Sequence, residues 1–283
     1  METQKSKITY ITPTVHIIGD NGLGVSEYAG RTAYDSFDKS ENEVIQNQEP
    51  SLEKLRDIEE SDLLDRLAWV FHHESVLEHT HITFLVKGMA RGILQEHARH
   101  RLQNITVRST RYTMSSILNA WQATKMTDDH YDGFRELILR MNIFAIDDAE
   151  LVDIEIEEMY KKLKIIFDRL EPQTYQSKGQ MEFMKDVSKL DMTPREIFEG
   201  LEILPQKRNV GDYFKSIVTD NWKTDLVFTM NLRSLKNFIK LRDSGAAWYP
   251  MQEFASAIVD ALPSKYKYLI IKRRNKKEGR GES

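Results

Sequence analysis

Residues 99–111, with the sequence RHRLQNITVRSTR, hold the chain's densest group of side chains that could bind a ligand. Three consecutive residues, Arg99 to Arg101, cannot share one helix face, but at a helix end they can fan out around a bound anion. Arg108 and Arg111 lie on either side of Ser109. This pattern favours a phosphorylated ligand of some size. A solvated basic turn is the alternative that the segment alone leaves open.

The elements around this segment should place the triplet at the end of a helix. Residues 81–87 alternate, with Ile82, Phe84 and Val86 on one face, which predicts a strand. Residues 89–100 follow as a predicted helix, so Arg99 to Arg101 would lie at its C-terminal end.

Other patterns predict a mixed α/β domain with an excess of helix. Residues 7–18 are rich in β-branched residues and predict a strand, and residues 37–50 are polar and predict a loop. Apolar spacings of three and four predict helices. We expect helices over residues 27–34, 52–71, from Val152 to Leu170, from a capping box at Thr193 to Glu196 up to Pro205, over 215–241 and over 252–262.

Composition limits the class of protein. The chain has 283 residues, 40% apolar and 30% charged, with a net charge of −4 and a pI near 6.1, which argues against a dedicated nucleic-acid binder. No window approaches the ~18 apolar residues of a membrane span, and the first ten residues lack a secretory core, so we expect a cytoplasmic protein. The absence of cysteine excludes disulfides, thiolate zinc sites and a cysteine nucleophile, and we expect no metal.

Four motifs in order resemble the flavin-dependent thymidylate synthases (ThyX). Arg99 to Arg101, seven residues and Ser109 are similar to that family's RHR-x7-S signature. The other three motifs are Arg31 to Ser36, similar to A-R-x-x-Y-x-S; His73 to His79, similar to H-x-[ST]-x-x-E-H; and Asn231 to Phe238 with Arg242, similar to N-x-R-S-L-x-x-F-x-x-x-R. The four motifs span about half of the chain, and the resemblance to the family covers residues 115–190 poorly.

The resemblance implies a fold and a domain organisation. We expect a ThyX-like α/β fold that is rich in helix, with a central antiparallel sheet flanked by helices. A single catalytic domain would cover residues 1–264, and residues 265–283 would form a basic, disordered tail. For that tail, nucleic-acid contact is the minority reading. The family is homotetrameric with active sites shared between subunits, which we expect here too.

The resemblance also implies roles for individual residues. Arg242 would polarise the uracil ring as the catalytic residue, because a guanidinium stays cationic and forms paired hydrogen bonds. The expected flavin contacts are His73, Ser75, Arg99, His100, Arg101, Asn231, Arg233 and Asn237. The expected nucleotide contacts are Glu96, Arg99, Ser109, Arg111 and Arg242. An ordinary polar surface helix is the alternative for Asn231 to Arg242 taken alone. His79 and His97 are expected to be structural.

The chain departs from the family pattern at positions that face the nucleotide. Thr106 and Val107 replace an Asn-Glu pair, and Glu96 replaces a glutamine, which puts an acid near a substrate phosphate unless a base neutralises it. Leu201 replaces an arginine, and residues 246–250 (AAWYP) replace an H-A-Q-W-E motif. The loss of one hydrogen-bond acceptor, or of one arginine that binds the phosphate, would each weaken the binding free energy of the nucleotide by about 1–3 kcal/mol. That is enough to redirect specificity, and not enough to rule out catalysis.

The expected activity is FAD-dependent transfer of a one-carbon unit from methylenetetrahydrofolate to C5 of dUMP, with NADPH reducing the flavin. Four alternatives stay open. The chain could act on another pyrimidine nucleotide, could make a hydroxymethylated base, could bind flavin or nucleotide without turnover, or could be an interaction protein that uses its basic tail.

Overall fold

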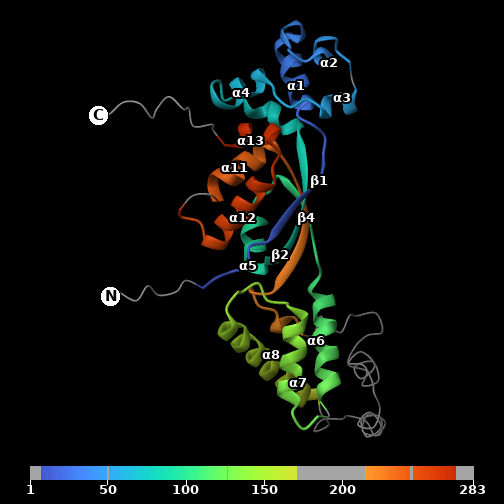
Figure 1. The fold of residues 1–283 in the computed structure, drawn as a ribbon, viewed down its shortest axis with the longest axis vertical. Helices are drawn as coiled ribbons and strands as arrows, with labels where there is room; N and C mark the ends of the chain where they lie inside the picture. The colour runs from blue at the N-terminus through green and yellow to red at the C-terminus, as the bar shows by residue number, and fades with distance from the viewer. Residues whose placement is uncertain (1–7, 50, 126, 171–213, 243–244, 272–283) are drawn as a thin grey trace, which may run out of the picture. The chain divides into compact units, whose positions relative to one another are not determined.

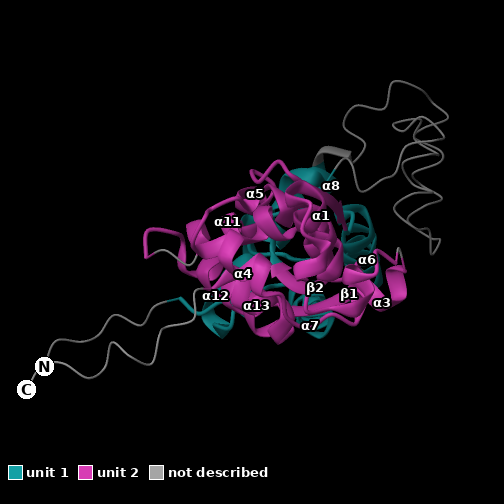
Figure 2. Cartoon of the chain, turned by 90° about the horizontal axis from the view of Figure 1, so that it is seen from above, with its two compact units in different colours: residues 1–11, 90–92, 108–224 teal, residues 12–89, 93–107, 225–283 magenta. Residues whose placement is uncertain are grey.

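The computed structural model describes residues 8–49, 51–125, 127–170, 214–242 and 245–271. These residues divide into two compact units, coloured separately in Figure 2. Unit 1 comprises residues 1–11, 90–92 and 108–224, and unit 2 comprises residues 12–89, 93–107 and 225–283. The prediction of one domain over 1–264 stays a prediction.

Unit 2 is built on a four-stranded sheet with the order β1-β2-β4-β3. Its strands are β1 (Thr14–Asp20), β2 (His81–Ala90), β3 (Gln103–Val107) and β4 (Lys223–Asn231). β1 pairs antiparallel with β2, and β3 pairs antiparallel with β4. Alternation places Phe84 of β2 and Phe228 of β4 in the core, where their rings stack with centroids 4.7 Å apart. The mixed α/β fold with an antiparallel sheet is therefore confirmed.

Helices cover this sheet in two groups (Figure 1). At one end lie α1 (Gly24–Tyr34), α2 (Glu43–Gln46), α3 (Leu52–Arg56) and α4 (Asp62–Trp69), with the short 3-10 helices η1 (Phe37–Lys39) and η2 (Glu74–His79). The second group is α11 (Leu232–Arg242), α12 (Tyr249–Ala261) and α13 (Ser264–Ile270). Phe254 of α12 packs against Phe228 of β4, with ring centroids 6.4 Å apart, which fixes that group on the sheet. The short helix α5 (Arg91–His97) follows β2.

Unit 1 is a helical unit with its own apolar core. It contains α6 (Thr110–Thr124), α7 (His130–Met141), α8 (Ala149–Leu170) and the 3-10 helix η4 (Lys215–Ile217). Trp121, Phe134 and Phe214 are buried in this core together with Ile156 and Leu163 of α8. The apolar stripe predicted from Val152 onward is therefore confirmed as the buried face of a helix.

Several predicted elements are wrong in type or extent. Residues 215–241 do not form one helix, because Thr224, Leu226, Phe228 and Met230 alternate into the core as strand β4 before α11 begins. Residues 103–107, for which the sequence predicts no strand, form β3. The predicted helix over 52–71 is two helices, and the predicted loop over 37–50 contains η1 and α2.

The chain's C-terminal part is ordered further than the tail prediction allows. Residues 264–270 form α13, because Tyr266, Leu269 and Ile270 are buried. The Tyr266 hydroxyl also donates to Asp20 at 2.6 Å. Residues 272–283, the capping box at 193–196 and Leu201 lie outside the described residues. Among the helices that the structure describes, none is both long and apolar enough to cross a membrane.

Candidate functional site

The Arg99 to Arg101 segment lies just after the C-terminal end of a helix, as the sequence predicts, and β3 follows it. α5 ends at His97, and the backbone N–H groups of Arg99 and His100 close two tight turns onto the carbonyls of Glu96 and His97. The chain then enters β3 at Gln103, whose side-chain amide donates to the His97 carbonyl at 2.8 Å. Arg99 and Arg101 are exposed and His100 is half-buried, so the three side chains do fan out.

The second predicted segment, Asn231 to Arg242, forms α11 with its cap. The Asn231 side-chain oxygen accepts a hydrogen bond from the Ser234 N–H at 2.8 Å, which makes Asn231 the N-terminal cap of the helix. Leu235, Phe238 and Ile239 are buried. The opposite face therefore presents Arg233 and Asn237, four residues apart, away from the core.

These two segments, more than a hundred residues apart in sequence, line one cavity of about 370 Å³ in unit 2. Leu102 and Leu241 form its apolar rim, and both are exposed. The polar lining is Arg99, His100, Arg101, Ser234, Asn237 and Arg242. We call this space the arginine cavity. Its lining supplies many hydrogen-bond donors, which fit a planar, acceptor-rich or anionic ligand.

Arg242 is held in place from three directions. Its Nη1 donates to the Glu96 carboxylate at 2.9 Å and its Nη2 to the Glu96 backbone carbonyl at 3.3 Å. Its Nε donates to Nε2 of His100 at 3.1 Å. Since Nε2 accepts this bond, His100 is a neutral imidazole with its proton on Nδ1. The acid that the sequence places near the substrate is thus neutralised by Arg242.

The two histidines of this region titrate below their usual range. Burial, then the charges of Arg242 and Arg99, lower the pKa of His100, which agrees with its role as an acceptor. Burial, then His100 and Arg242, lower the pKa of His97 to about 3. His97 is enclosed by the rings of Phe228, Phe238 and Phe254. Neither of its ring nitrogens has a partner among the described residues, so His97 is a core residue and not a ligand contact.

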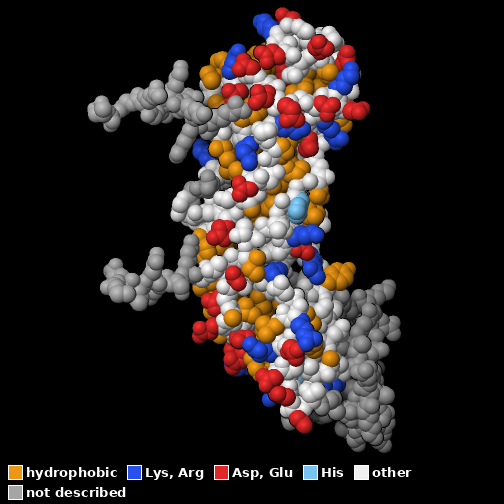
Figure 3. Space-filling view, viewed as in Figure 1, with side chains coloured by type: hydrophobic (Ala, Val, Ile, Leu, Met, Phe, Trp, Pro, Cys, Tyr) orange, Lys and Arg blue, Asp and Glu red, His pale blue; other side chains and the backbone are white. Residues whose placement is uncertain are grey.

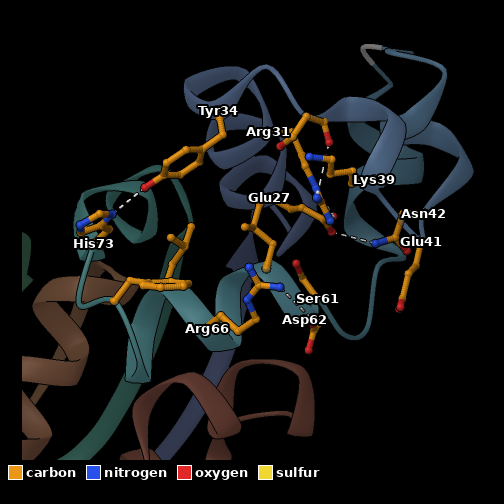
Figure 4. Close-up of a pocket in the computed structure, with 14 residues that line it drawn as sticks. Glu27, Arg31, Tyr34, Lys39, Glu41, Asn42, Ser61, Asp62, Arg66 and His73 are labelled. Atoms are coloured by element: carbon orange, nitrogen blue, oxygen red, sulfur yellow. Dashed lines mark hydrogen bonds and ion pairs between the residues drawn. The ribbon is translucent and has the colours of Figure 1, made fainter.

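A second cavity in unit 2, of about 520 Å³, contains His73 (Figure 4). The Tyr34 hydroxyl lies 2.5 Å from Nδ1 of His73, and the two rings are close to parallel, at 8°. We call this space the tyrosine cavity. Its lining is Glu27, Arg31, Tyr34, Ser36, Lys39, Glu41, Asn42, Ser61, Asp62, Leu63, Arg66, Leu67, Phe71 and His73.

A buried ion pair stabilises one wall of the tyrosine cavity. Glu27 is 1% exposed and accepts hydrogen bonds from Arg31, Ser40 and Asn42. A buried carboxylate with this many donors is a fixed structural group and not a free base. On the opposite side, His73 follows His72, whose φ of 55° is in the left-handed region, so the backbone there is strained.

α11 connects the two cavities through η2. The Lys236 ammonium donates to Glu74 at 2.6 Å and to the Ala68 carbonyl at 2.9 Å, and lies 3.6 Å from the centre of the Trp69 ring. Arg233 pairs with Glu78 near the end of η2. The sequence motif contains Lys236 without revealing this role, because its partners are more than 160 residues away.

The other predicted site residues are placed differently. Ser75 is exposed on η2 and lines neither of the two cavities. Ser109 and Arg111 belong to unit 1, where the Ser109 hydroxyl caps α6 by accepting from the Arg111 N–H at 3.3 Å. Their assignment as nucleotide contacts stays a prediction. Tyr34 lies within the Arg31 to Ser36 motif, but only its contact with His73 identifies it as a cavity residue.

Comparison with known proteins places this architecture in a family. Residues 19–265 match the Thy1 family model, described as thymidylate synthase complementing protein. The chain belongs to the Thy1 family. The match extends over both units and over both cavities, and it confirms the family resemblance drawn from the four motifs.

Relatives of this Thy1-family chain are similar over nearly their whole length. A flavin-dependent thymidylate synthase of Helicobacter pylori (strain ATCC 700392 / 26695) is 29% identical over 249 residues, covering 88% of this chain and 92% of the relative. One from Campylobacter jejuni (strain RM1221) is 28% identical over 248 residues, covering 88% and 91%. A crystal structure of ThyX from Helicobacter pylori with FAD and dUMP matches with a TM-score of 0.57 and 23% identity, covering 91% of this chain and 97% of that one. This structural likeness supports the fold.

Proposed function

We propose that this chain is a flavin-dependent thymidylate synthase that methylates C5 of dUMP with a one-carbon unit from methylenetetrahydrofolate. The observation that carries the proposal is the arginine cavity, where Arg99 to Arg101 meet Asn237 and Arg242 in a member of the Thy1 family. The relatives quoted above are named for this activity, and the ThyX structure from Helicobacter pylori holds FAD and dUMP.

The residues of the arginine cavity fit the proposed ligands. A pyrimidine and an isoalloxazine both present carbonyl oxygens along a planar edge, and Arg242, His100 and Asn237 can donate to such edges. Arg99 and Arg101 carry no ion pair in the described part of the chain and can hold anionic groups. The chain contains no cysteine, so the uracil ring is not activated by an enzyme thiolate.

In this proposal the protein positions its ligands and stabilises charge. Arg242, fixed by Glu96 and His100, would donate to a carbonyl of the uracil ring and stabilise negative charge that develops there. His100 would donate through Nδ1. FAD, when bound, supplies the electrons that reduce the transferred carbon. We propose that NADPH in turn reduces the FAD.

We place the folate in the tyrosine cavity. The nearly parallel rings of Tyr34 and His73 give a surface on which a planar heterocycle can stack. Lys39 and Arg66, which also line the cavity, could pair with the carboxylates of a folate tail. We further propose a cytoplasmic homotetramer whose active sites are shared between subunits.

Product analysis tests the proposal. Purified protein is incubated with FAD, NADPH, dUMP and methylenetetrahydrofolate labelled at the transferred carbon, and the nucleotides are identified by mass spectrometry. Labelled dTMP is the expected product. A protein that stays colourless with FAD, or that makes no labelled nucleotide, would contradict the proposal and favour a binding protein without turnover.

One observation favours a second candidate, a relative that modifies another pyrimidine or makes a hydroxymethylated base. Glu96, Thr106 and Val107 differ from the family pattern at the positions expected near the nucleotide. The same assay with dCMP in place of dUMP, scored for methyl and hydroxymethyl products, separates the two candidates.

A further inference from the structure

The pairing of Glu96 with Arg242 changes what the arginine cavity can recognise. An arginine in a cavity binds phosphate well when no carboxylate pairs with it, because its guanidinium combines positive charge with several hydrogen-bond donors in one plane. Here the Glu96 carboxylate lies 2.9 Å from Nη1, and the side chains of Arg242 and Glu96 are only 16% and 31% exposed. The pair is therefore poorly screened by solvent and close to neutral as a unit.

The same contacts leave Arg242 able to donate in a fixed direction. A guanidinium has five N–H groups. Glu96 and His100 take three of them, one on each of the three nitrogens. Two N–H groups, one on Nη1 and one on Nη2, have no partner among the described residues. Arg242 thus offers two oriented donors, as part of an ion pair whose net charge is close to zero.

The rest of the cavity keeps its positive charge. Arg99 and Arg101 line the same space, and neither forms an ion pair with any residue that the structure describes. The cavity is therefore polarised, with a neutralised donor end at Arg242 and a cationic end at Arg99 and Arg101.

We propose that Glu96 is a specificity-determining residue. By pairing with Arg242, it makes Arg242 donate to the uncharged carbonyl edge of a pyrimidine and leaves the phosphate to Arg99 and Arg101, which have no carboxylate partner among the described residues. This inference rests on the proposed function, because it takes a pyrimidine nucleotide as the substrate. A neutral glutamine at position 96, the residue of the family pattern, would keep an acceptor for Nη1 and would leave Arg242 with its full charge.

The test measures binding of orthophosphate and of deoxyuridine, which represent the two ends of the substrate, to the FAD-loaded protein by isothermal titration calorimetry. In Glu96→Gln we expect a second orthophosphate site that depends on Arg242. Orthophosphate should bind at Arg242 about tenfold more tightly in this variant than in the wild type. The affinity for deoxyuridine should stay within about twofold of the wild-type value. Glu96→Asp, which keeps the charge, should behave like the wild type. The double variant Glu96→Gln/Arg242→Gln should lose the added phosphate site.

A matched control is Glu49→Gln, which neutralises a carboxylate paired with Lys54 outside both cavities. It should change neither affinity. Unaltered orthophosphate binding in Glu96→Gln, or a gain that survives removal of Arg242, would overturn the proposed role of Glu96. If neither the wild type nor any variant binds deoxyuridine or dUMP, the proposed function fails, and the phosphate measurements still report separately on the charge of Arg242.

Discussion

Replacing His97 by leucine should remove a loss of stability that the wild-type chain undergoes in mild acid. His97 is fully buried among three phenylalanine rings, and burial is the main cause that lowers its pKa from 6.5 to about 3. The folded chain therefore keeps this imidazole neutral at pH 5, whereas the unfolded chain protonates it. Because the unfolded state binds the extra proton, stability falls as the pH decreases.

The size of the effect follows from the distance between the pH and the unfolded pKa. At pH 5 the solution is about 1.5 units below the pKa of 6.5 and still above the folded value of about 3. Each unit corresponds to about 1.4 kcal/mol, so His97 should cost about 2 kcal/mol of unfolding free energy between pH 8 and pH 5. The cost keeps growing until the pH reaches the folded pKa.

Chemical denaturation at pH 8, 7, 6 and 5 measures this loss. Other groups titrate in the same range, so the quantity to compare is the difference in pH dependence between the wild type and His97→Leu. We expect the variant's unfolding free energy to fall by about 2 kcal/mol less than that of the wild type. His16→Leu, which removes an exposed histidine on β1, is the matched control and should keep the wild-type pH dependence. Parallel curves for the wild type and His97→Leu would refute the reasoning.

Four further predictions concern the site and its support. Arg242→Ala should leave FAD bound and abolish turnover, so an unchanged rate of dTMP formation would remove Arg242 from the site. Arg99→Ala should weaken the binding of both dUMP and FAD, which titration calorimetry and flavin fluorescence measure. Lys236→Met should destabilise unit 2 by about 2 kcal/mol in urea denaturation, because it leaves the Glu74 carboxylate unpaired and removes the contact with Trp69. Phe228→Ala should cost about 3–5 kcal/mol by the same measurement, and a loss below 1 kcal/mol would contradict its central place in the sheet.

The sequence predicts well those elements whose pattern is local. The alternation of residues 81–87 and the stripe from Val152 each follow one period over many residues, and both elements form as expected. The sequence does not predict strand β4, because the clear helical spacing of Leu232 to Arg242 follows directly on its alternating run and favours one long helix over both. β3 has only five residues and none of them is buried, so its strand character depends on pairing with β4 and not on its own pattern.

The candidate site was predictable as a set of residues but not as a set of contacts. The motifs named Arg99 to Arg101 and Arg242, and the structure brings them to one cavity. The pairing of Glu96 with Arg242 joins residues 146 positions apart, and no local pattern encodes a contact of that range. The same holds for Tyr34 and His73, which are 39 positions apart and meet only because α1 and η2 pack together.

α11 determines how the two cavities of unit 2 can work on one set of ligands. Arg233 and Lys236, near its start, hold η2 and with it the segment of His73. Arg242, at its last turn, holds the end of α5 and the arginine triplet. Arg233 and Arg242 are nine positions apart, which is about 14 Å along a helix axis. One helix therefore anchors elements that line both cavities, with His73 in one and the arginine triplet in the other.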